Sequence, residues 1–67
     1  MNRLTPREVQ VLNLLATGAT NKAIAHALGI GVNTVKRHVR SIFLKLGVSS
    51  RTQAALTWTA GDNSDGH

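Results

Sequence analysis

The sequence predicts a small all-α domain of four helices, in which the second and third form a helix-turn-helix without a β-wing. Start and stop residues bracket four segments, apolar residues recur within them at helical spacing, and strand-like alternation is missing. The chain has 67 residues, enough for one domain with a thin core. We expect residues 1–61 to form this domain and residues 62–67 to be a disordered polar tail.

The first helix is expected at about residues 6–17. Its start combines a capping residue, a proline suited to the first helical position and a capping-box carboxylate, which are Thr5, Pro6 and Glu8. Gly18 supplies the left-handed residue that stops it.

The second and third helices are expected at about residues 21–28 and 32–46. Thr20 can cap the second with its hydroxyl, whereas Gly31, the cap of the third, has no side chain to do so. Gly47 ends the third helix.

The expected third helix has two different faces. At about 100° per residue, its apolar residues fall on one arc. These residues are Val35, Val39, Ile42, Phe43 and Leu46. A second arc is cationic and amide-bearing and consists of Asn33, Lys36, Arg37 and Arg40. This separation is the most informative local pattern in the sequence.

The fourth helix is expected at about residues 51–59, with Gly61 as its stop. Ser50 and Gln53 have the spacing of a second full capping box. Leu56 is assigned to the core, while Trp58 is the candidate for a dimer contact, because so small a core rarely encloses a whole indole.

Composition narrows the classes of partner and cofactor. Eight Lys and Arg against three acidic residues give a net charge of +5, which favours a polyanion, either nucleic acid or an anionic membrane. Cysteine is absent, and His26 and His38 have no further ligand at metal-binding spacing, so we expect no metal and no cofactor. No apolar run reaches the ~20 residues of a membrane span, and the expected location is the bacterial cytoplasm.

The corner between the second and third helices carries the functional prediction. Ala25, Gly29 and Val35 provide a small residue at the helix crossing, a flexible turn residue and a core anchor, as a helix-turn-helix requires. The third helix of such a domain lies in the major groove. Base contacts are therefore expected from Asn33, Lys36, Arg37 and Arg40. DNA backbone contacts are expected from Thr20, Lys22, Lys45 and Arg51.

Three runs of residues carry a resemblance to a known family. They are Leu4-Thr5-x-Arg7-Glu8-x2-Val11-Leu12, Gly18-x2-Asn21-Lys22-x-Ile24-Ala25-x2-Leu28, and Thr34-Val35-Lys36-x-His38-x3-Ile42-x2-Lys45-Leu46-Gly47-Val48-x2-Arg51-Thr52-x-Ala54. Together they resemble the LuxR-type helix-turn-helix domain, which also ends response regulators of the NarL/FixJ class. The resemblance covers residues 4 to about 59. Two positions depart from the family pattern, Ala23 in place of Glu and Gly31 in place of Ser or Thr.

The resemblance implies a bacterial transcription regulator that binds double-stranded DNA. It implies base contacts at Lys36, Arg37 and Arg40. It implies backbone contacts at Asn21, Lys22, Thr34 and Arg51. The last helix would carry the contact of a homodimer on two half-sites, and RNA polymerase is a further expected partner, on the nucleoid.

Other interpretations of the sequence remain open. The cationic arc could be an ordinary solvated face, and the promoter-binding region of a sigma factor also uses such a turn. Residues 45–52 and the capped helix after them favour the LuxR type over the sigma region. A helix lying on a membrane would need a continuous, aromatic-rich apolar side, but the chain has one Trp and one Phe. An enzyme is not expected, because no nucleophile, base and orienting group can be assembled.

Overall fold

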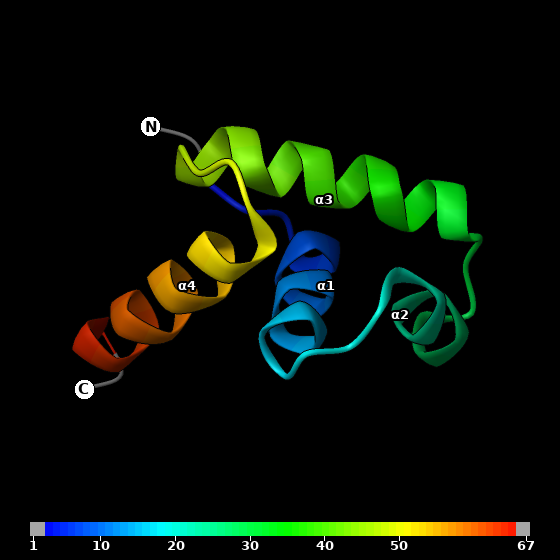
Figure 1. The fold of residues 1–67 in the computed structure, drawn as a ribbon, viewed down its shortest axis with the longest axis horizontal. Coiled ribbons are helices and arrows are strands. Elements are labelled where there is room, and N and C mark those ends of the chain that lie inside the picture. Colours follow the sequence, from blue (N-terminus) through cyan, green and yellow to red (C-terminus); the bar gives the residue numbers. More distant parts are fainter. Residues whose placement is uncertain (1–2, 66–67) are drawn as a thin grey trace.

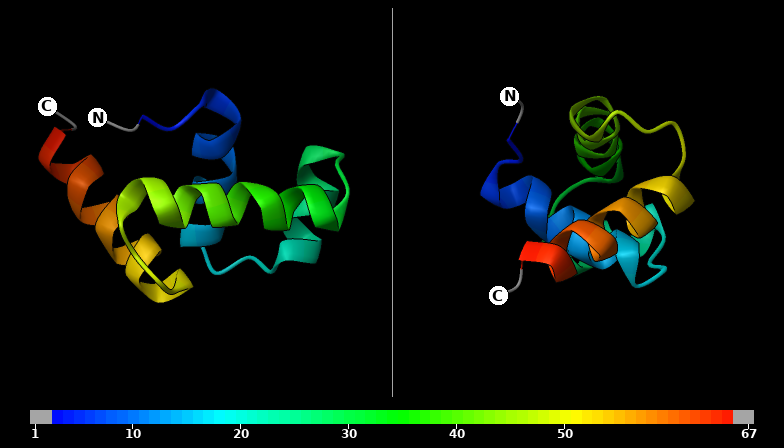
Figure 2. Two further views of the ribbon diagram at one scale, coloured as in Figure 1. Left: turned by 90° about the horizontal axis from the view of Figure 1, so that it is seen from above. Right: turned by 90° about the vertical axis from the view of Figure 1, so that its left-hand side faces the viewer.

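The computed structural model describes the backbone of residues 3–65 and the side chains of residues 3–58. It has four helices and, in these residues, no strand: α1 (Pro6–Ala16), α2 (Asn21–Leu28), α3 (Val32–Leu46) and α4 (Arg51–Asp65). The long helix α3 lies across α1, with α2 at one end and α4 at the other (Figure 1). The view from above shows the same crosswise arrangement (Figure 2). The predicted all-α, four-helix class is confirmed.

The core lies where α3 crosses α1. All four helices contribute buried apolar side chains, which are Val11, Leu12, Leu15, Ile24, Ala25, Val35, Val39, Ile42 and Ala54. Burying a side chain of Val, Leu or Ile size contributes roughly 1.5–3 kcal/mol. The helix α1 packs on each of the other three helices. The helix α3 packs mainly on α1 and α2, which therefore set its position.

The starts of α1 and α2 follow the predicted chemistry. Thr5 Oγ1 accepts from the Glu8 N–H at 3.1 Å, and Glu8 Oε1 accepts from the Thr5 N–H at 2.8 Å, which confirms the capping box. Thr20 Oγ1 accepts from the Ala23 N–H at 3.1 Å, and Gly31 caps α3 without a side-chain bond.

The start of α4 has only half of the predicted capping box. Ser50 Oγ accepts from the Gln53 N–H at 3.1 Å, as expected. Gln53 Oε1, however, accepts from the Ser49 N–H at 2.9 Å and from the Ser49 hydroxyl at 3.2 Å. The amide oxygen reaches one residue further back because Ser49 offers it two donors, so the prediction of a full box was wrong.

Three helix ends closed by glycine share one geometry. Gly18, Gly29 and Gly47 have positive φ angles of 93°, 68° and 71°. In each case the N–H of the next residue donates to a carbonyl five positions earlier: Ala19 to Leu14, Ile30 to Ala25 and Val48 to Phe43. The residue after each glycine is apolar and half-buried, which completes the Schellman motif.

The predicted end of α4 at residue 59 was wrong, because the helix continues through Gly61 to Asp65. A glycine inside a helix costs only about 1 kcal/mol relative to Ala and does not end it without a further contact. Gly61 is followed by Asp62, which cannot supply the apolar contact found after the other three glycines. Residues 62–65 of the expected tail are therefore helical, and residues 66–67 lie outside the described residues.

The apolar side of α4 also differs from the prediction. Ala54 is fully buried and Trp58, one turn later, is half-buried against the core, whereas Leu56 is 66% exposed. At about 100° per residue, Leu56 lies roughly 200° from Ala54, on the opposite side of the helix. The assignment of Leu56 to the core was therefore wrong.

Candidate nucleic-acid interface

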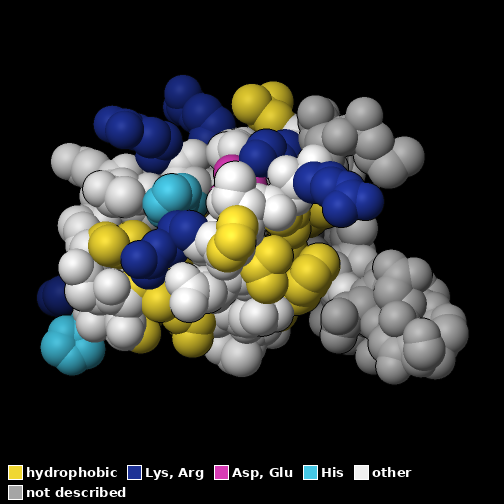
Figure 3. Space-filling model, turned by 180° about the vertical axis from the view of Figure 1, so that it is seen from behind, with side chains coloured by type: hydrophobic (Ala, Val, Ile, Leu, Met, Phe, Trp, Pro, Cys, Tyr) yellow, Lys and Arg dark blue, Asp and Glu magenta, His cyan; other side chains and the backbone are white. Residues whose placement is uncertain are grey.

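The outward face of α3 brings together the four residues predicted to contact bases. Asn33, Lys36, Arg37 and Arg40 are all exposed, while Val35, Val39 and Ile42 on the same helix are buried. Seen from behind, several Lys and Arg side chains project along the upper part of the molecule, and others lie lower on the same face (Figure 3). The two-faced helix predicted from periodicity is thus present as a cationic ridge, by which we mean residues 33, 36, 37 and 40.

The first residue of α2 lies beside this ridge. A shallow hollow is lined by Asn21, Lys36, Val39, Arg40, Phe43 and Leu44. Lys22 and Thr34 are exposed, and Thr20 uses its hydroxyl to cap α2. Of the residues expected at the DNA backbone, Asn21 is therefore the one that the structure places next to two cations of the ridge.

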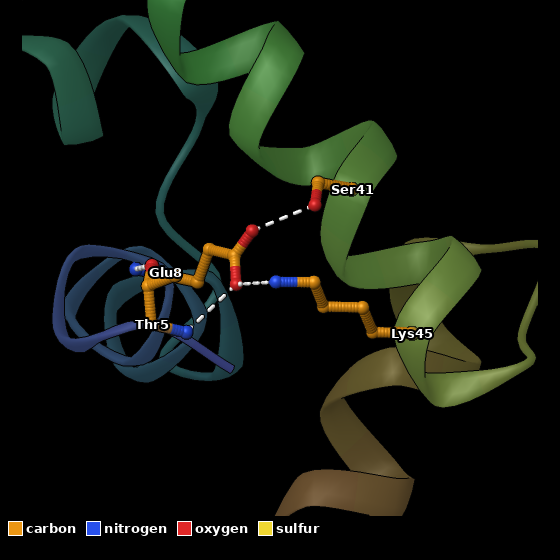
Figure 4. A network of polar contacts seen from close by, with 4 residues as sticks. All are labelled: Thr5, Glu8, Ser41 and Lys45. Atoms are coloured by element: carbon orange, nitrogen blue, oxygen red, sulfur yellow. Dashed lines mark hydrogen bonds and ion pairs between the residues drawn. The ribbon is translucent and has the colours of Figure 1, made fainter. Parts of the chain in front are cut away.

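A buried carboxylate on α1 holds α3 in place. Glu8 is only 5% exposed, and Figure 4 shows it between the start of α1 and the C-terminal half of α3. In addition to the Thr5 N–H, it accepts from Ser41 Oγ at 2.6 Å and from Lys45 Nζ at 2.7 Å. These bonds fix α3 both along its axis and in its rotation.

The surroundings of Glu8 stabilise its ionised form. Burial alone would raise the pKa of this carboxyl, but the hydrogen bonds from Lys45, Ser41 and Thr5 and the charge of Lys45 outweigh it and lower the pKa from 4.5 to about 2. Sequence reasoning found only the capping role of Glu8. The sequence did offer a signal for its ion pair: Glu8 is the one acidic residue before position 62, in a chain with a large excess of cations.

Lys45 was expected to contact the DNA backbone. Its ammonium is instead paired with Glu8, and its side chain is 24% exposed. A lysine that satisfies a buried carboxylate is not free to turn outward without leaving that charge unpaired. The structure therefore gives Lys45 a role inside the protein.

Arg51 was also expected at the DNA backbone, and it too is engaged within the chain. Its Nη1 donates to Asn21 Oδ1 at 2.7 Å, and its Nη2 donates to the Ala19 carbonyl at 2.7 Å. The half-buried guanidinium thus joins the first residue of α4 to the first residue of α2 and to the turn before it.

Trp58, the predicted dimer contact, is turned toward its own chain. Its Nε1–H donates to Asn13 Oδ1 at 2.7 Å, and its ring packs against the core. Leu56 is the exposed large apolar residue of α4, and it lies beside a hollow that also includes Leu15, Ala16 and Ala55.

The two histidines considered as metal ligands, His26 and His38, lie on α2 and α3. His26 is exposed and His38 is half-buried. Within the described residues, no three His, Asp or Glu side chains come close enough to hold a metal ion. In the same part of the chain, no helix is long and apolar enough to cross a membrane.

A short turn joins α2 to α3, the core and the Glu8 carboxylate hold α3 in place, and a row of donors lies on the outer side of α3. These features define a helix-turn-helix domain. The model of the luxR family of bacterial regulatory proteins matches residues 2–58. The chain belongs to this family, which confirms the resemblance seen in the sequence.

Individual relatives agree with this assignment. The transcriptional regulatory protein LiaR of Bacillus subtilis (strain 168) is 53% identical over 53 residues, covering 79% of this chain and 25% of LiaR. The CsgBAC operon transcriptional regulatory protein of Escherichia coli (strain K12) is 50% identical over 60 residues, 90% of this chain and 27% of that protein. The nitrate/nitrite response regulator NarL of Escherichia coli (strain K12) is 46% identical over 56 residues, 84% and 26% respectively. The chain spans about a quarter of the length of these relatives.

Proposed function

We propose that this domain binds double-stranded DNA in a sequence-specific manner, with α3 in the major groove, as the DNA-binding part of a bacterial transcription regulator. The observation that carries the proposal is the cationic ridge on α3, which lies opposite the buried side of the same helix, while Ser41 and Lys45 on the flank between the two hold Glu8. An α-helix fits the width of the major groove, where Arg and Lys can donate to guanine and Asn can pair with adenine.

The proposed contacts fall into two sets. Base edges are read by the cationic ridge. The DNA backbone is contacted by the start of α2 and of α3, through Thr20, Asn21, Lys22 and Thr34. Lys45 and Arg51 are left out of the second set because both donate to partners within the chain.

The proposed assembly on DNA is a homodimer that places one α3 in each of two successive major grooves. The contact between the two protomers is assigned to α4, through Leu56 instead of Trp58. A two-fold interface needs a self-complementary patch, and the exposed Leu56 lies next to a hollow lined by Leu15, Ala16 and Ala55. Such a regulator would act on the nucleoid in the bacterial cytoplasm, with RNA polymerase as a further partner.

Selection of bound duplexes from a random pool, followed by titration of the preferred and of a random duplex, tests the proposal. The Arg40→Ala variant should lose about 1–3 kcal/mol on the preferred duplex and much less on the random one. Arg7→Ala, which removes the same charge from an exposed site on α1, is the matched control and should not alter the preference. Equal losses of Arg40→Ala on both duplexes would contradict the assignment of Arg40 to a base.

The same titration against vesicles of anionic lipid separates this function from membrane binding. The DNA proposal requires tighter binding to duplex than to vesicles at equal salt. Binding to vesicles alone would favour the surface-helix interpretation.

A further inference from the structure

We infer that Arg51 is a positioning residue for DNA binding, which fixes the phosphate-facing start of α2 and the orientation of the Asn21 amide. The inference rests on the proposed function, because it concerns how the DNA backbone is contacted. It differs from a direct phosphate contact by Arg51, which both the sequence pattern and the charge of the residue had suggested.

The start of α2 is held by the burial of Ile24 in the core, but within the described residues no packing joins it to α4. In the described part of the chain α2 and α4 do not pack on one another, and α2 makes its main contact with α3. The two bonds of Arg51, each 2.7 Å long, bridge this gap from α4 to Asn21 and to the Ala19 carbonyl. The planar guanidinium suits this task because its N–H groups form a rigid fork that can reach two acceptors at once.

The amide of Asn21 is oriented by its bond to Arg51. Arg51 can only donate, so Asn21 must present its Oδ1 to the guanidinium. The Nδ2 group, with two N–H donors, is then directed away from Arg51 and remains a donor for an anion. Asn21 lines the same hollow as Lys36 and Arg40, so an anion there would meet an oriented amide beside two cations.

The donors next to Asn21 are positioned by the same tie. Because the Thr20 hydroxyl already accepts from the Ala23 N–H, the first turn of α2 has a fixed cap and a fixed direction. Tying Asn21 to α4 fixes the position of that turn relative to the rest of the domain. Lys22, which comes directly after Asn21 and is exposed, is positioned by the same tie.

Salt-dependent titration distinguishes positioning from direct contact. Affinities for the preferred and the random duplex are measured over a range of salt concentrations for the wild type, Arg51→Lys, Arg51→Ala and Lys22→Ala. A residue that neutralises a phosphate lowers the salt slope by about 0.9 when it is removed. We expect this loss of slope for Lys22→Ala and an unchanged slope for Arg51→Ala.

The affinities themselves provide the second readout. Both Arg51 variants should bind both duplexes about tenfold more weakly, since an ammonium keeps the charge but cannot bridge two acceptors. Adding Asn21→Ala to Arg51→Ala should cause little further loss, because the two residues act as one unit. Full affinity in Arg51→Lys together with a reduced slope in Arg51→Ala would overturn the inference in favour of a direct phosphate contact.

Hydrogen exchange of the free protein tests the tie without DNA. In Arg51→Lys, the amides of residues 23 and 24, which donate to Thr20, should exchange several-fold faster, while those of the α1 core keep their protection. Unchanged exchange at residues 23 and 24 would overturn the inference. Failure of the wild type to bind any duplex would refute the proposed function instead, and the exchange result would still report on the tie.

Discussion

At the scale of single residues, the buried carboxylate of Glu8 shows how a chain with few acids positions α3. Its oxygens accept from two groups on α3 and from one backbone N–H before α1. A buried charge of this kind is costly unless it is both paired and hydrogen-bonded, and Glu8 is both.

The titration of Glu8 predicts a specific loss of stability in acid. The folded-state pKa of about 2 lies below the ordinary value of 4.5, so ionised Glu8 favours folding. Its contribution, up to about 3 kcal/mol, is complete above pH 4.5 and is lost as the pH falls toward 2. Urea unfolding over this pH range measures it.

The matched variant for this prediction is Glu8→Gln, which keeps the shape of the side chain but does not titrate. Its free energy of unfolding should be lower at neutral pH and nearly flat between pH 4.5 and 2. A wild-type curve as flat as that of the variant would show that folding does not lower the pKa of Glu8.

Lys45 and Lys22 form a contrasting pair of lysines. Lys45→Ala leaves the Glu8 carboxylate without its cation and should lower the free energy of unfolding by about 2 kcal/mol. Because Lys45 makes no proposed phosphate contact, the salt slope of DNA binding should be unchanged. Lys22→Ala should do the reverse, with stability within about 0.5 kcal/mol of the wild type. Chemical denaturation and salt titration of both variants check this, and a lower slope for Lys45→Ala would return that residue to the DNA backbone.

At the scale of helices, local sequence chemistry predicted where each began and where three of them ended. Caps, proline and apolar periodicity act within one turn, which is why α2 and α3 have the predicted bounds and α1 ends one residue earlier. The end of α4 was missed because a glycine ends a helix only when the next residue makes an apolar contact. The residue after Gly18, Gly29 or Gly47 packs against the core, whereas the residue after Gly61 is an aspartate.

The two glycines that flank α3 should respond to substitution in opposite ways. Gly31 has an ordinary φ of −77° and room for a Cβ, so Gly31→Ser adds a capping hydroxyl and should stabilise the domain by about 0.5–1 kcal/mol. Gly47 has a φ of +71°, so Gly47→Ala should destabilise by about 1 kcal/mol although no atom blocks its Cβ. Thermal unfolding of both variants measures the difference, and equal melting temperatures would contradict it.

At the scale of the whole molecule, the contacts that fix the helices relative to one another could not be predicted from local patterns. The bonds Lys45–Glu8, Arg51–Asn21 and Trp58–Asn13 join residues 37, 30 and 45 positions apart. Each residue had a plausible role on the surface when considered alone. Only the folded chain shows that two of the expected phosphate contacts, Lys45 and Arg51, and the expected dimer contact, Trp58, are engaged internally.

This redistribution moves the proposed dimer contact from Trp58 to Leu56, which gives the last prediction. Leu56 is 66% exposed, so Leu56→Asp should leave the monomer nearly as stable as before. It should weaken binding to a duplex with two half-sites by about tenfold, because dimer pairing is lost, and leave binding to a single half-site unchanged. Trp58→Ala should instead lower monomer stability, since it removes a half-buried ring and its bond to Asn13.

Titration of duplexes with one and two half-sites, together with denaturation of each variant, distinguishes these roles. If Leu56→Asp bound two half-sites as tightly as the wild type, α4 would not pair through this face. The hollow beside Leu56 would then have no part in assembly on DNA. The exposed side of α4 would be explained by solvation alone, since single apolar residues on a surface are common.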